Sequence, residues 1–489
     1  MTPVDLRLVP AALTSWAVTA AGITWAGVGA GVAAVAAVVA TAVTGAWAGR
    51  RGPAGRRRTW PSAVAAVALV AVGFGVAVTL REAAVRHHPI TAAVGRSIPV
   101  IVAPAETPRV LAGGRTMFRG VLHDLDGAPS DGRVLVFASG AEYARLQPGQ
   151  PAAFRAVVSA PKRRDLTVAV LASRGAPVTG TAAPVQQVAH GVRTDFAAAA
   201  RSALPADQAA MLPALVLGDT STVPPTTVAQ FRVAGLTHLT AVSGANVTIV
   251  CGAVLLSAAV LGPRAAVVLA GATLLGFVIV VQPSASVLRA AVMGAITLLA
   301  VLSHRRRQAL PALAGTVVAL MVGAPELAVD VGFALSVSAT AALVLIAPVW
   351  TQRLTDRGWP RPLAAAVSVA FAAQVVTAPL VAGISGSVSL VAVIANLAAA
   401  PVVPPLTVAG TAAAALAPLW PAGADLLIRF TGPEVWWLLA VARWSSALPA
   451  AAVPVPSGVA GVALIAAAAL VVAAGWHWAV SGRRDTIVR

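Results

Sequence analysis

Long apolar runs, each able to cross a lipid bilayer, restrict this chain to a helical membrane fold. The first run covers residues 9–48 and contains no charged side chain. One transmembrane helix needs about 20 apolar residues, so this run predicts two spans, which we expect to join near residues 27–31. Only 11% of the sequence is charged, whereas soluble domains contain about 25% charged residues. The sequence therefore predicts a polytopic α-helical membrane protein with about 10–12 spans or half-spans.

Further apolar runs complete the predicted membrane part. We expect spans or half-spans at residues 9–28, 31–49, 61–80, 239–262, 264–281, 284–303, 309–323, 330–348, 363–382, 386–400, 403–419 and 459–480. Pro401, Pro404 and Pro405 separate the pair 386–400 and 403–419. Because proline cannot donate a helical hydrogen bond, we expect this pair to be a broken, re-entrant hairpin.

Basic loops predict how the chain is oriented. Arginines gather within residues 50–58, 303–307, 351–357 and 483–484. Cytoplasmic loops carry an excess of Lys and Arg, so we expect all four segments in the cytoplasm. The spans agree with this if 386–419 turns back and the segment with Trp436 and Trp444 lies at the membrane interface. This predicts a multi-pass protein of the plasma (inner) membrane with both termini in the cytoplasm.

Residues 85–187 differ from the runs on either side. Charges of both signs appear, apolar runs shorten, and turn signals recur, as at Asp126 and Gly127. Segments such as 98–102 and 133–137 are rich in β-branched residues and too short to span. They predict a small β-rich barrel or sandwich, which the predicted orientation places outside the cytoplasm.

Helical spacing returns in residues 188–235, where apolar positions such as Phe196 and Leu204 are interrupted by Arg193 and Arg201. We expect an amphipathic segment that lies on the membrane surface. The predicted domains are therefore N-terminal membrane helices with an arginine-rich cytoplasmic loop (1–84), the β domain (85–187), the interfacial segment (188–235) and the main transmembrane domain (236–489).

Polar side chains in and beside the second membrane block are the candidate site, because unpaired polar groups in hydrocarbon cost several kcal/mol. They are Asp219, His238, Ser243, Asn246, Arg289, Asp330, Ser336, Gln374 and Asn396. We expect them to line a polar path, with Arg289 and Asp330 placed to pair on neighbouring spans.

Each candidate also has a structural interpretation. Arg289 could snorkel to the surface, and Asp330 could cap the helix that follows it. The amides could hold helices together. His238 could be an interfacial residue without a role, and Asp219 a turn residue. The sequence leaves these alternatives open.

Catalytic and metal-binding motifs are not found in the sequence. The 7 histidines form no metal-ligand pattern, and the chain has 1 cysteine, Cys251. Ser243 lacks the remaining pattern of a nucleophile elbow, and no phosphate-binding P-loop occurs. We therefore expect no catalytic residues, no metal and no cofactor, and a protein that is not an enzyme.

An ordered series of short motifs is the most specific signal. It comprises Leu215 to Asp219, Phe231, residues 235–247, Ser284 to Met293, Pro325, residues 330–340, Pro379, and Asn396 ahead of Pro401. In this series the chain resembles the ComEC-type competence family, over about residues 190–405. The resemblance implies an inner-membrane channel that takes up single-stranded DNA during natural transformation, and an OB-like fold for the β domain.

The resemblance also implies partners. These are single-stranded DNA, the lipid bilayer, a DNA receptor outside the cell, a cytoplasmic helicase motor and a separate nuclease; whether the pore lies in one chain or in a homo-oligomer stays open. Two departures matter. Many members have histidine where this chain has Asn246, and many carry a C-terminal metallo-β-lactamase-like domain that has no counterpart up to Arg489. We therefore do not expect the nuclease role of that domain here.

Arginines of the β domain are the expected contacts to DNA phosphates. They are Arg115, Arg119, Arg133, Arg155, Arg163 and Arg164. They could instead form a solvated surface, and the few aromatic residues of this domain are expected mainly in its core. The alternative function is a transporter or flippase of a smaller anionic solute, because broken helices beside polar residues are also typical of transporters.

Overall fold

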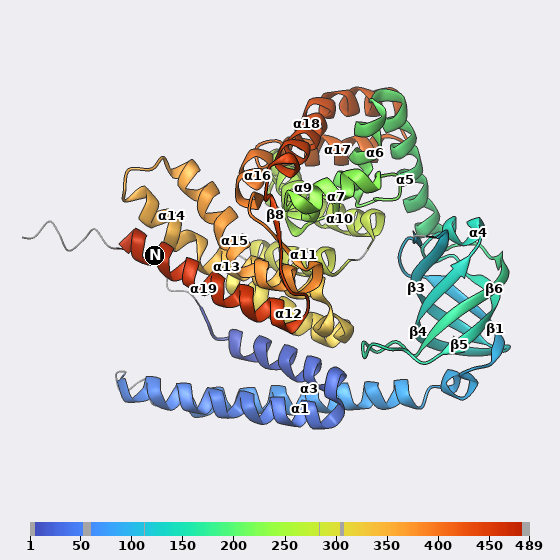
Figure 1. Cartoon of the computed structure of the whole chain (residues 1–489), viewed down its shortest axis with the longest axis horizontal. Coiled ribbons are helices and arrows are strands. Elements are labelled where there is room, and N and C mark those ends of the chain that lie inside the picture. The colour runs from blue at the N-terminus through green and yellow to red at the C-terminus, as the bar shows by residue number, and fades with distance from the viewer. Residues whose placement is uncertain (1–4, 52–59, 112, 283, 304–307, 482–489) are drawn as a thin grey trace, which may run out of the picture. The chain divides into compact units, whose positions relative to one another are not determined.

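The computed structural model describes residues 5–51, 60–111, 113–282, 284–303 and 308–481 (Figure 1). The chain forms two compact units. Unit 1 comprises Met1–His190 and Ala314–Asp330, and unit 2 comprises Gly191–Leu313 and Val331–Arg489. The arginines at 56–58, 305–307 and 483–484, which determine much of the predicted orientation, lie outside the described residues.

Unit 1 contains the N-terminal helices and the β domain. Its elements are α1 (Val9–Arg51), α3 (Trp60–Arg86), η1 (Pro89–Ala93), β1 (Ser97–Pro104), β2 (Arg109–Val110), β3 (Arg115–Leu125), β4 (Ala128–Ser139), α4 (Ala141–Ala144), β5 (Ala152–Ser159), β6 (Ala169–Thr179) and η3 (Pro325–Val329). Helix α5 (Pro184–Ala203) begins in unit 1 and ends in unit 2, and α12 (Ala309–Gly323) joins unit 2 back to unit 1.

A sharp break divides α1 into two helices. The backbone leaves helical geometry at Trp25 (φ −121°, ψ 17°) and Ala26 (φ 60°, ψ −162°). A Cβ at Gly29 would overlap the carbonyl oxygen of Ala21 and the side chain of Trp25, so glycine permits the tight turn. The expected junction is therefore confirmed as a break slightly before residues 27–31. Together the two halves form one candidate membrane span, Val9–Thr44, and the crossing of the membrane by each half stays a prediction.

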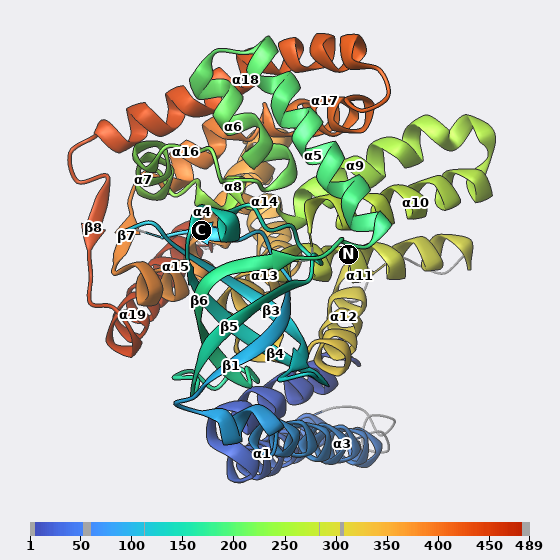
Figure 2. The ribbon, with the colours of Figure 1, turned by 90° about the vertical axis from the view of Figure 1, so that its right-hand side faces the viewer.

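Five strands of the β domain close into a barrel (Figure 2). Strand β1 pairs with β5 on one side and with β3 on the other, so the order β1-β5-β6-β4-β3 returns to β1. Strands β4 and β6 are parallel, and the short helix α4 lies between β4 and β5 in the sequence. This closed five-stranded Greek-key connectivity is that of an OB fold, as the resemblance implies.

Alternating burial fills the barrel interior. On β3, Thr116, Phe118, Gly120 and Leu122 point inward, and their neighbours do not. This period of two is the strand signature, because successive side chains point to opposite faces. Tyr143 of α4 closes one end of the barrel core: it is 0% exposed, and its hydroxyl donates to the carbonyl of Gly175 at 3.1 Å.

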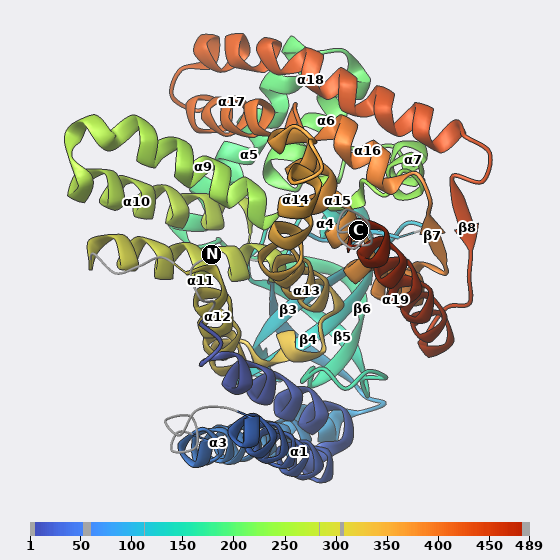
Figure 3. The same cartoon turned by 90° about the vertical axis from the view of Figure 1, so that its left-hand side faces the viewer.

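Unit 2 is helical. Its elements are α6 (Ala206–Leu217), α7 (Pro225–Val233), α8 (Thr237–Thr240), α9 (Gly244–Ser257), η2 (Ala258–Leu261), α10 (Pro263–Val281), α11 (Ala285–Leu302), α13 (Val331–Leu345), α14 (Ala347–Thr355), α15 (Arg361–Ser385), β7 (Ser387–Ser389), α16 (Ala392–Ala399), α17 (Val403–Leu416), α18 (Pro421–Ala447), β8 (Ala452–Pro454) and α19 (Val459–Ser481). Helices α9, α10 and α11 pack side by side (Figure 3).

Eight of the described helices are long and apolar enough to cross a membrane. A ninth candidate is the pair α16 and α17, which is bent by 56° at the break before Val403. The predicted polytopic helical fold and the break at the prolines are thus confirmed. The predicted span 386–400 is wrong at its start, because residues 387–389 form strand β7, which pairs with β8.

The expected interfacial segment is partly wrong. Helix α5 is amphipathic, but α6 is enclosed in the core of unit 2, where Met211, Leu212 and Leu215 are at most 5% exposed. The charges that suggested a surface position lie on α5 and at the start of α6, as Asp207 does. The last two turns of α6 are apolar on every side, which is the pattern of a buried helix.

Helix α18 has no counterpart among the predicted spans. It has 27 residues, and its Trp436 and Trp444 are 47% and 59% exposed, whereas Val435 and Leu438 are buried in the unit 2 core. Scattered charges such as Arg429 and Glu434 hide this helix from a search for uninterrupted apolar runs.

Candidate functional site

Gly235 allows the close packing that positions the segment from Gly235 to α9. Gly235 has φ +72°, a conformation that a side chain rarely adopts, and a Cβ there would overlap Ala392 of α16. This close approach brings the turn before α8 against α16. Asn396 of α16 donates to the carbonyl of Gly235 at 3.5 Å and to that of Ala392 at 2.8 Å.

His238 lies on the same turn and hydrogen-bonds to the backbone of Gly235. Its side chain is reached by solvent, yet the protein around it disfavours the charged imidazole and lowers the pKa of His238 below its ordinary value. The bond to Gly235 opposes this shift. We call Gly235, His238 and Asn396 the Gly235 cluster; it joins two of the predicted site residues.

Asn246 connects two helices at the start of α9. It is 6% exposed, its Nδ2 donates to the carbonyl of Leu215 in α6 at 3.2 Å, and its Oδ1 accepts from Ser243 Oγ at 3.1 Å. Both polar ends of the amide are therefore satisfied within the protein. These contacts favour the interpretation of Asn246 as a joint between helices.

Arg289 of α11 points into the protein. It is 7% exposed; its Nε donates to Ser336 Oγ of α13 at 2.7 Å, and its Nη1 lies 3.1 Å from Met293 Sδ. Ser286 Oγ lies 3.2 Å from the same Ser336 oxygen. Snorkelling to the surface, the alternative interpretation of Arg289, is therefore wrong.

The guanidinium of Arg289 also reaches α9. A Cβ on Gly244 would overlap Nη2 of Arg289, so the two groups are in direct contact. Four predicted site residues thus gather around Gly244, and with Ser286 and Gly244 itself we call them the Arg289 cluster. Its members are Ser243, Gly244, Asn246, Ser286, Arg289 and Ser336.

The remaining predicted residues lie apart from these clusters. Gln374 Nε2 donates to the carbonyl of Ser389 at 3.5 Å. Asp219 follows the left-handed Gly218 that ends α6, and its Oδ1 accepts from the amide of Ser221 at 3.0 Å, as expected of a turn residue. It also interacts electrostatically with Arg193, where burial lowers the pKa of the guanidinium and Asp219 opposes that shift.

Asp330 ends unit 1, and α13 of unit 2 begins at the next residue. Its backbone is extended, with φ −83° and ψ 123°, and its amide donates to the carbonyl of Leu327 at 3.1 Å. Extended geometry directly before a helix is that of an N-cap residue. Among the described residues, the hydrogen bonds of Arg289 go to the neutral groups of Ser336 and Met293, and the pairing of Arg289 with Asp330 stays a prediction.

A cleft of about 600 Å³ lies on the outer face of the barrel. Its lining comes from the segment between β1 and β3, which includes β2, from strands β3 and β4, and from the segment that runs from the end of β5 to the start of β6. The residues are Glu106, Arg109, Met117, Arg119, Leu135, Phe137, Ser159, Ala160, Pro161, Lys162, Arg163, Asp165, Thr167 and Val170. We call this the barrel cleft.

Two of the six predicted arginines, Arg119 and Arg163, line the barrel cleft. The others lie outside its lining. Arg133 forms an ion pair with Glu326, Arg155 donates to the carbonyl of Ser97 at 2.9 Å, and Arg164 donates to that of Thr24 at 3.1 Å. Arg115 is also outside the lining.

Two further cations of the cleft, Arg109 and Lys162, are not among the six arginines predicted to contact DNA. Lys162 lies between β5 and β6, and Arg109 begins the two-residue strand β2, which is too short to show a periodicity in the sequence. The signal that could have found them is the OB connectivity, because the loops after the first and fourth barrel strands border the binding face of that fold.

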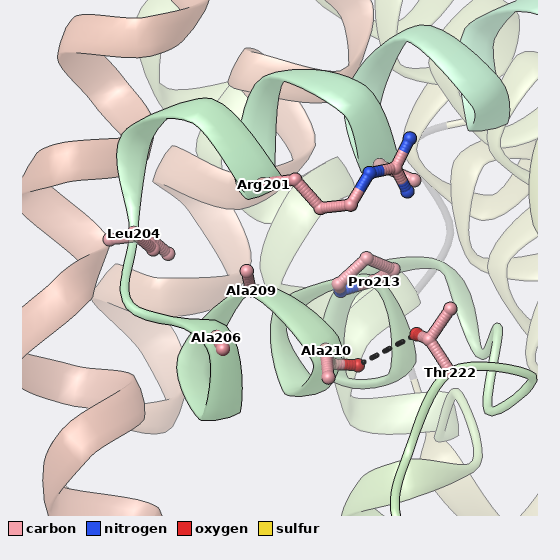
Figure 4. A pocket seen from close by; sticks show the side chains of 8 residues that line it. Arg201, Leu204, Ala206, Ala209, Ala210, Pro213 and Thr222 are labelled. Atoms are coloured by element: carbon pink, nitrogen blue, oxygen red, sulfur yellow. Dashed lines mark hydrogen bonds between the residues drawn. The ribbon is translucent and has the colours of Figure 1, made fainter.

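A second cavity, of about 340 Å³, lies between α5 and α6 (Figure 4). Its walls are mostly apolar, with Ala209 and Pro213 on one side and the side chain of Arg201 reaching across from α5. Thr222 closes it through a hydrogen bond from Oγ1 to the carbonyl of Ala210 at 3.2 Å. None of the predicted site residues lines it.

Metal ligands do not gather in the described residues, where no group of three or more His, Cys, Asp or Glu side chains is placed to hold a metal ion. The polar groups of the two clusters are hydroxyls, amides, the imidazole of His238 and the guanidinium of Arg289, and the barrel cleft combines four cations with the carboxylates of Glu106 and Asp165. Such groups can bind anions and polar solutes.

Comparison with known proteins adds one finding. No curated protein and no solved structure matches the chain significantly. A model of the competence protein family matches residues 215–480, more than half of the sequence, and this range contains both polar clusters. The chain therefore belongs to the competence protein family.

Proposed function

We propose that this protein is a passive channel that conducts single-stranded DNA across the plasma membrane into the cytoplasm during natural transformation. The barrel cleft is the observation that carries the proposal. It coincides with the strands and loops that OB folds use to bind oligonucleotides. Membership of the competence family, which indicates a role in DNA uptake, points to the same substrate.

The chemistry of the barrel cleft suits a single strand. Arg109, Arg119, Lys162 and Arg163 outnumber the acids Glu106 and Asp165 in its lining, so the cleft attracts a polyanion. Phe137 is half-buried there and offers an apolar ring on which a base can stack. Stacking is worth about 1–3 kcal/mol per base and tolerates every sequence, as a DNA uptake system requires.

Within the membrane part, the Gly235 cluster and the Arg289 cluster supply polar groups to the path. We assign Asp219, Asp330 and Gln374 to the same path, on the ground that charged and amide groups among apolar helices need a polar environment. No P-loop occurs in the sequence, so the proposal assigns the driving force to a cytoplasmic helicase motor. A DNA receptor outside the cell and a separate nuclease complete the proposed system.

Binding of DNA to the barrel cleft tests the proposal. Replacing Arg119, Lys162 and Arg163 together by Ala is expected to weaken binding of a fluorescent oligothymidylate at least 10-fold. It should also lower the slope of log affinity against log salt by about 3, because each phosphate contact adds roughly 1 to the slope. Fluorescence anisotropy of the purified full-length chain at several salt concentrations measures both.

A matched triple variant provides the control. Arg96, Arg145 and Arg174 are exposed barrel residues outside the cleft, and their replacement by Ala removes the same charge. The control variant should keep most of the affinity. Equal losses in the two triple variants would show that only net charge matters and would contradict the assignment of the cleft.

Uptake in cells tests the channel itself. Deleting the gene should abolish entry of labelled DNA into the cytoplasm and spare its binding at the cell surface, because the channel acts after capture. Unchanged entry would refute the proposal.

A transporter or flippase of a smaller anionic solute is the second candidate. The bend of 56° between α16 and α17, beside Asn396, favours it, because broken helices at polar residues are typical of transporter binding sites. Liposomes that contain the protein distinguish the two. Flux of small organic anions without passage of an oligonucleotide would select the transporter.

A further inference from the structure

Arg289 is a buried cation with neutral contacts. Its side chain is 7% exposed, and its hydrogen bonds go to Ser336 and Met293. Among the described residues, none of the ion pairs includes Arg289. An unbalanced charge inside a protein is costly, so buried charges are normally paired with an opposite charge.

The free end of this guanidinium lies at the N-terminus of α9. Nη2 contacts Gly244, the first residue of that helix, and no hydrogen bond to a described residue uses this nitrogen. The N-cap residue Ser243 does not cap α9 with its side chain, and its hydroxyl donates to Asn246 Oδ1. The backbone amide of Asn246 donates to the carbonyl of Ser243 at 3.1 Å, so the amides of Gly244 and Ala245 are the donors at this helix end that lack a side-chain acceptor beside the unpaired cation.

We propose that Arg289 and the first turn of α9 bind one phosphodiester anion. A helix N-terminus carries about half a positive charge and free amides, and it binds anions when other positive charge is present. The inference rests on the proposed function in one respect: it names the backbone group of the strand that this part of the path would hold.

The charge balance favours a phosphodiester. One guanidinium and one helix end match a monoanion better than a dianion, and a phosphodiester has a single charge shared by two free oxygens. The planar fork of arginine donates to two such oxygens in parallel. The hydroxyl groups of Ser243, Ser286 and Ser336, all half-buried and thus within reach of solvent, border this position.

Dimethyl phosphate is the probe for this site, because it is the smallest stable phosphodiester. The full-length chain, purified in a phosphate-free maltoside detergent, is unfolded by heat while its tryptophan fluorescence is recorded. Dimethyl phosphate should raise the unfolding midpoint in a saturable way compared with chloride at equal ionic strength, since a ligand of the folded state stabilises it. Arg289→Met should abolish this rise.

Gly244→Ala is the sharper variant. Its methyl group would displace the flexible end of Arg289 and leave every charge in place. Because the glycine is the first residue of a helix and does not have a left-handed backbone, alanine is tolerated there. We expect at least a 10-fold loss in apparent affinity for dimethyl phosphate. Arg264→Met, which removes an exposed arginine at the start of α10, should bind like the wild type.

The first result that would overturn the site is a wild-type chain whose unfolding midpoint shows no saturable rise with dimethyl phosphate. The second is an equal rise of the midpoint in Gly244→Ala. This second test remains valid even if Arg289→Met does not fold. A strand and a phospholipid headgroup both contain this anion. Oligothymidylate and dihexanoyl phosphatidylglycerol are therefore compared as competitors of dimethyl phosphate, and we expect the oligonucleotide to compete more strongly. Failure of both competitors would also overturn the proposal.

The outcomes separate this inference from the proposed function. Dimethyl phosphate binding that depends on Arg289, in a chain whose deletion leaves DNA entry unchanged, would keep the anion site and refute the DNA channel. Loss of DNA entry on deletion, together with no anion binding, would do the reverse.

Discussion

Arg289 and Asn246 show how single polar residues are accommodated among apolar helices. Arg289 donates to a serine of a neighbouring helix, and Asn246 is bonded at both ends of its amide. Each such bond contributes about 0.5–1.5 kcal/mol, but leaving the group unpaired would cost more than that. At the residue scale, the hydrogen bonds that join neighbouring helices are therefore made by the same side chains that form the candidate site.

At the residue scale, we also expect the stability of the protein to depend on pH through His238. Its pKa is lowered in the folded protein, from an ordinary value of about 6.5. Below pH 6.5 the unfolded chain therefore binds a proton that the folded chain resists, and stability falls as the pH drops from 6.5 toward the folded pKa. His238→Gln, which cannot titrate, should show a smaller loss of the unfolding midpoint between pH 7.5 and pH 5.

Thermal unfolding of both proteins across this pH range measures the effect. His123→Gln, at an exposed position of strand β3, is the control and should follow the wild type. Parallel curves for the wild type and His238→Gln would contradict a coupling of His238 to folding.

At the scale of elements, closure of the barrel depends on a close approach of two strands. Pro104 of β1 pairs with Gly120 of β3, and a Cβ on Gly120 would overlap Val102 and the carbonyl of Ala103. Glycine thus lets β1 bond to β3 as well as to β5, and this second pairing converts an open sheet into a barrel.

Gly120→Ala is therefore expected to destabilise the barrel by about 1–3 kcal/mol, the usual cost of forcing an extra methyl group into a packed interior. One of the two obstructing groups, the carbonyl of Ala103, is backbone, so a change of the Val102 rotamer cannot relieve the whole overlap. Limited proteolysis of the full-length chain should cut within residues 97–179 faster than in the wild type.

A glycine with free space supplies the comparison. Gly191 of α5 has no atom within 4 Å of a built Cβ, and Gly191→Ala should leave the cleavage rate unchanged. Equal rates for Gly120→Ala and the wild type would show that the barrel closes without this glycine.

At the scale of the whole molecule, orientation in the membrane is the prediction with the widest consequences. The basic segments predict the barrel outside and the segment that contains Arg357 in the cytoplasm. A barrel that receives DNA from outside the cell requires this orientation. If the barrel were in the cytoplasm, or the segment with Arg357 outside, the barrel cleft could not receive DNA at the entrance of the proposed path.

Cysteine labelling in intact cells measures the orientation. The chain has 1 cysteine, Cys251, so Cys251→Ser gives a background without thiols. In that background, Arg174→Cys on the barrel should react with a membrane-impermeant maleimide from outside. Arg357→Cys, also at an exposed position, should react only after the cells are permeabilised. The opposite pattern would invert the topology.

The sequence by itself determined the class of fold and the location of its parts. Apolar runs too long for a soluble core require membrane helices, and alternation with turn residues requires a β domain between them. The ordered motifs indicated the family, and a matching family model shows it. These features are local in the sequence, because chain length and side-chain polarity alone decide them.

Only the tertiary structure decided which polar residues meet. Arg289 joins Ser336 and Gly244, residues far from it in the sequence. Likewise α6 is buried and α18 is a single long helix, which their charges conceal. The physical reason is that helix packing and strand pairing bring distant positions together, and a periodic pattern specifies only which face of an element is apolar, not what that face meets.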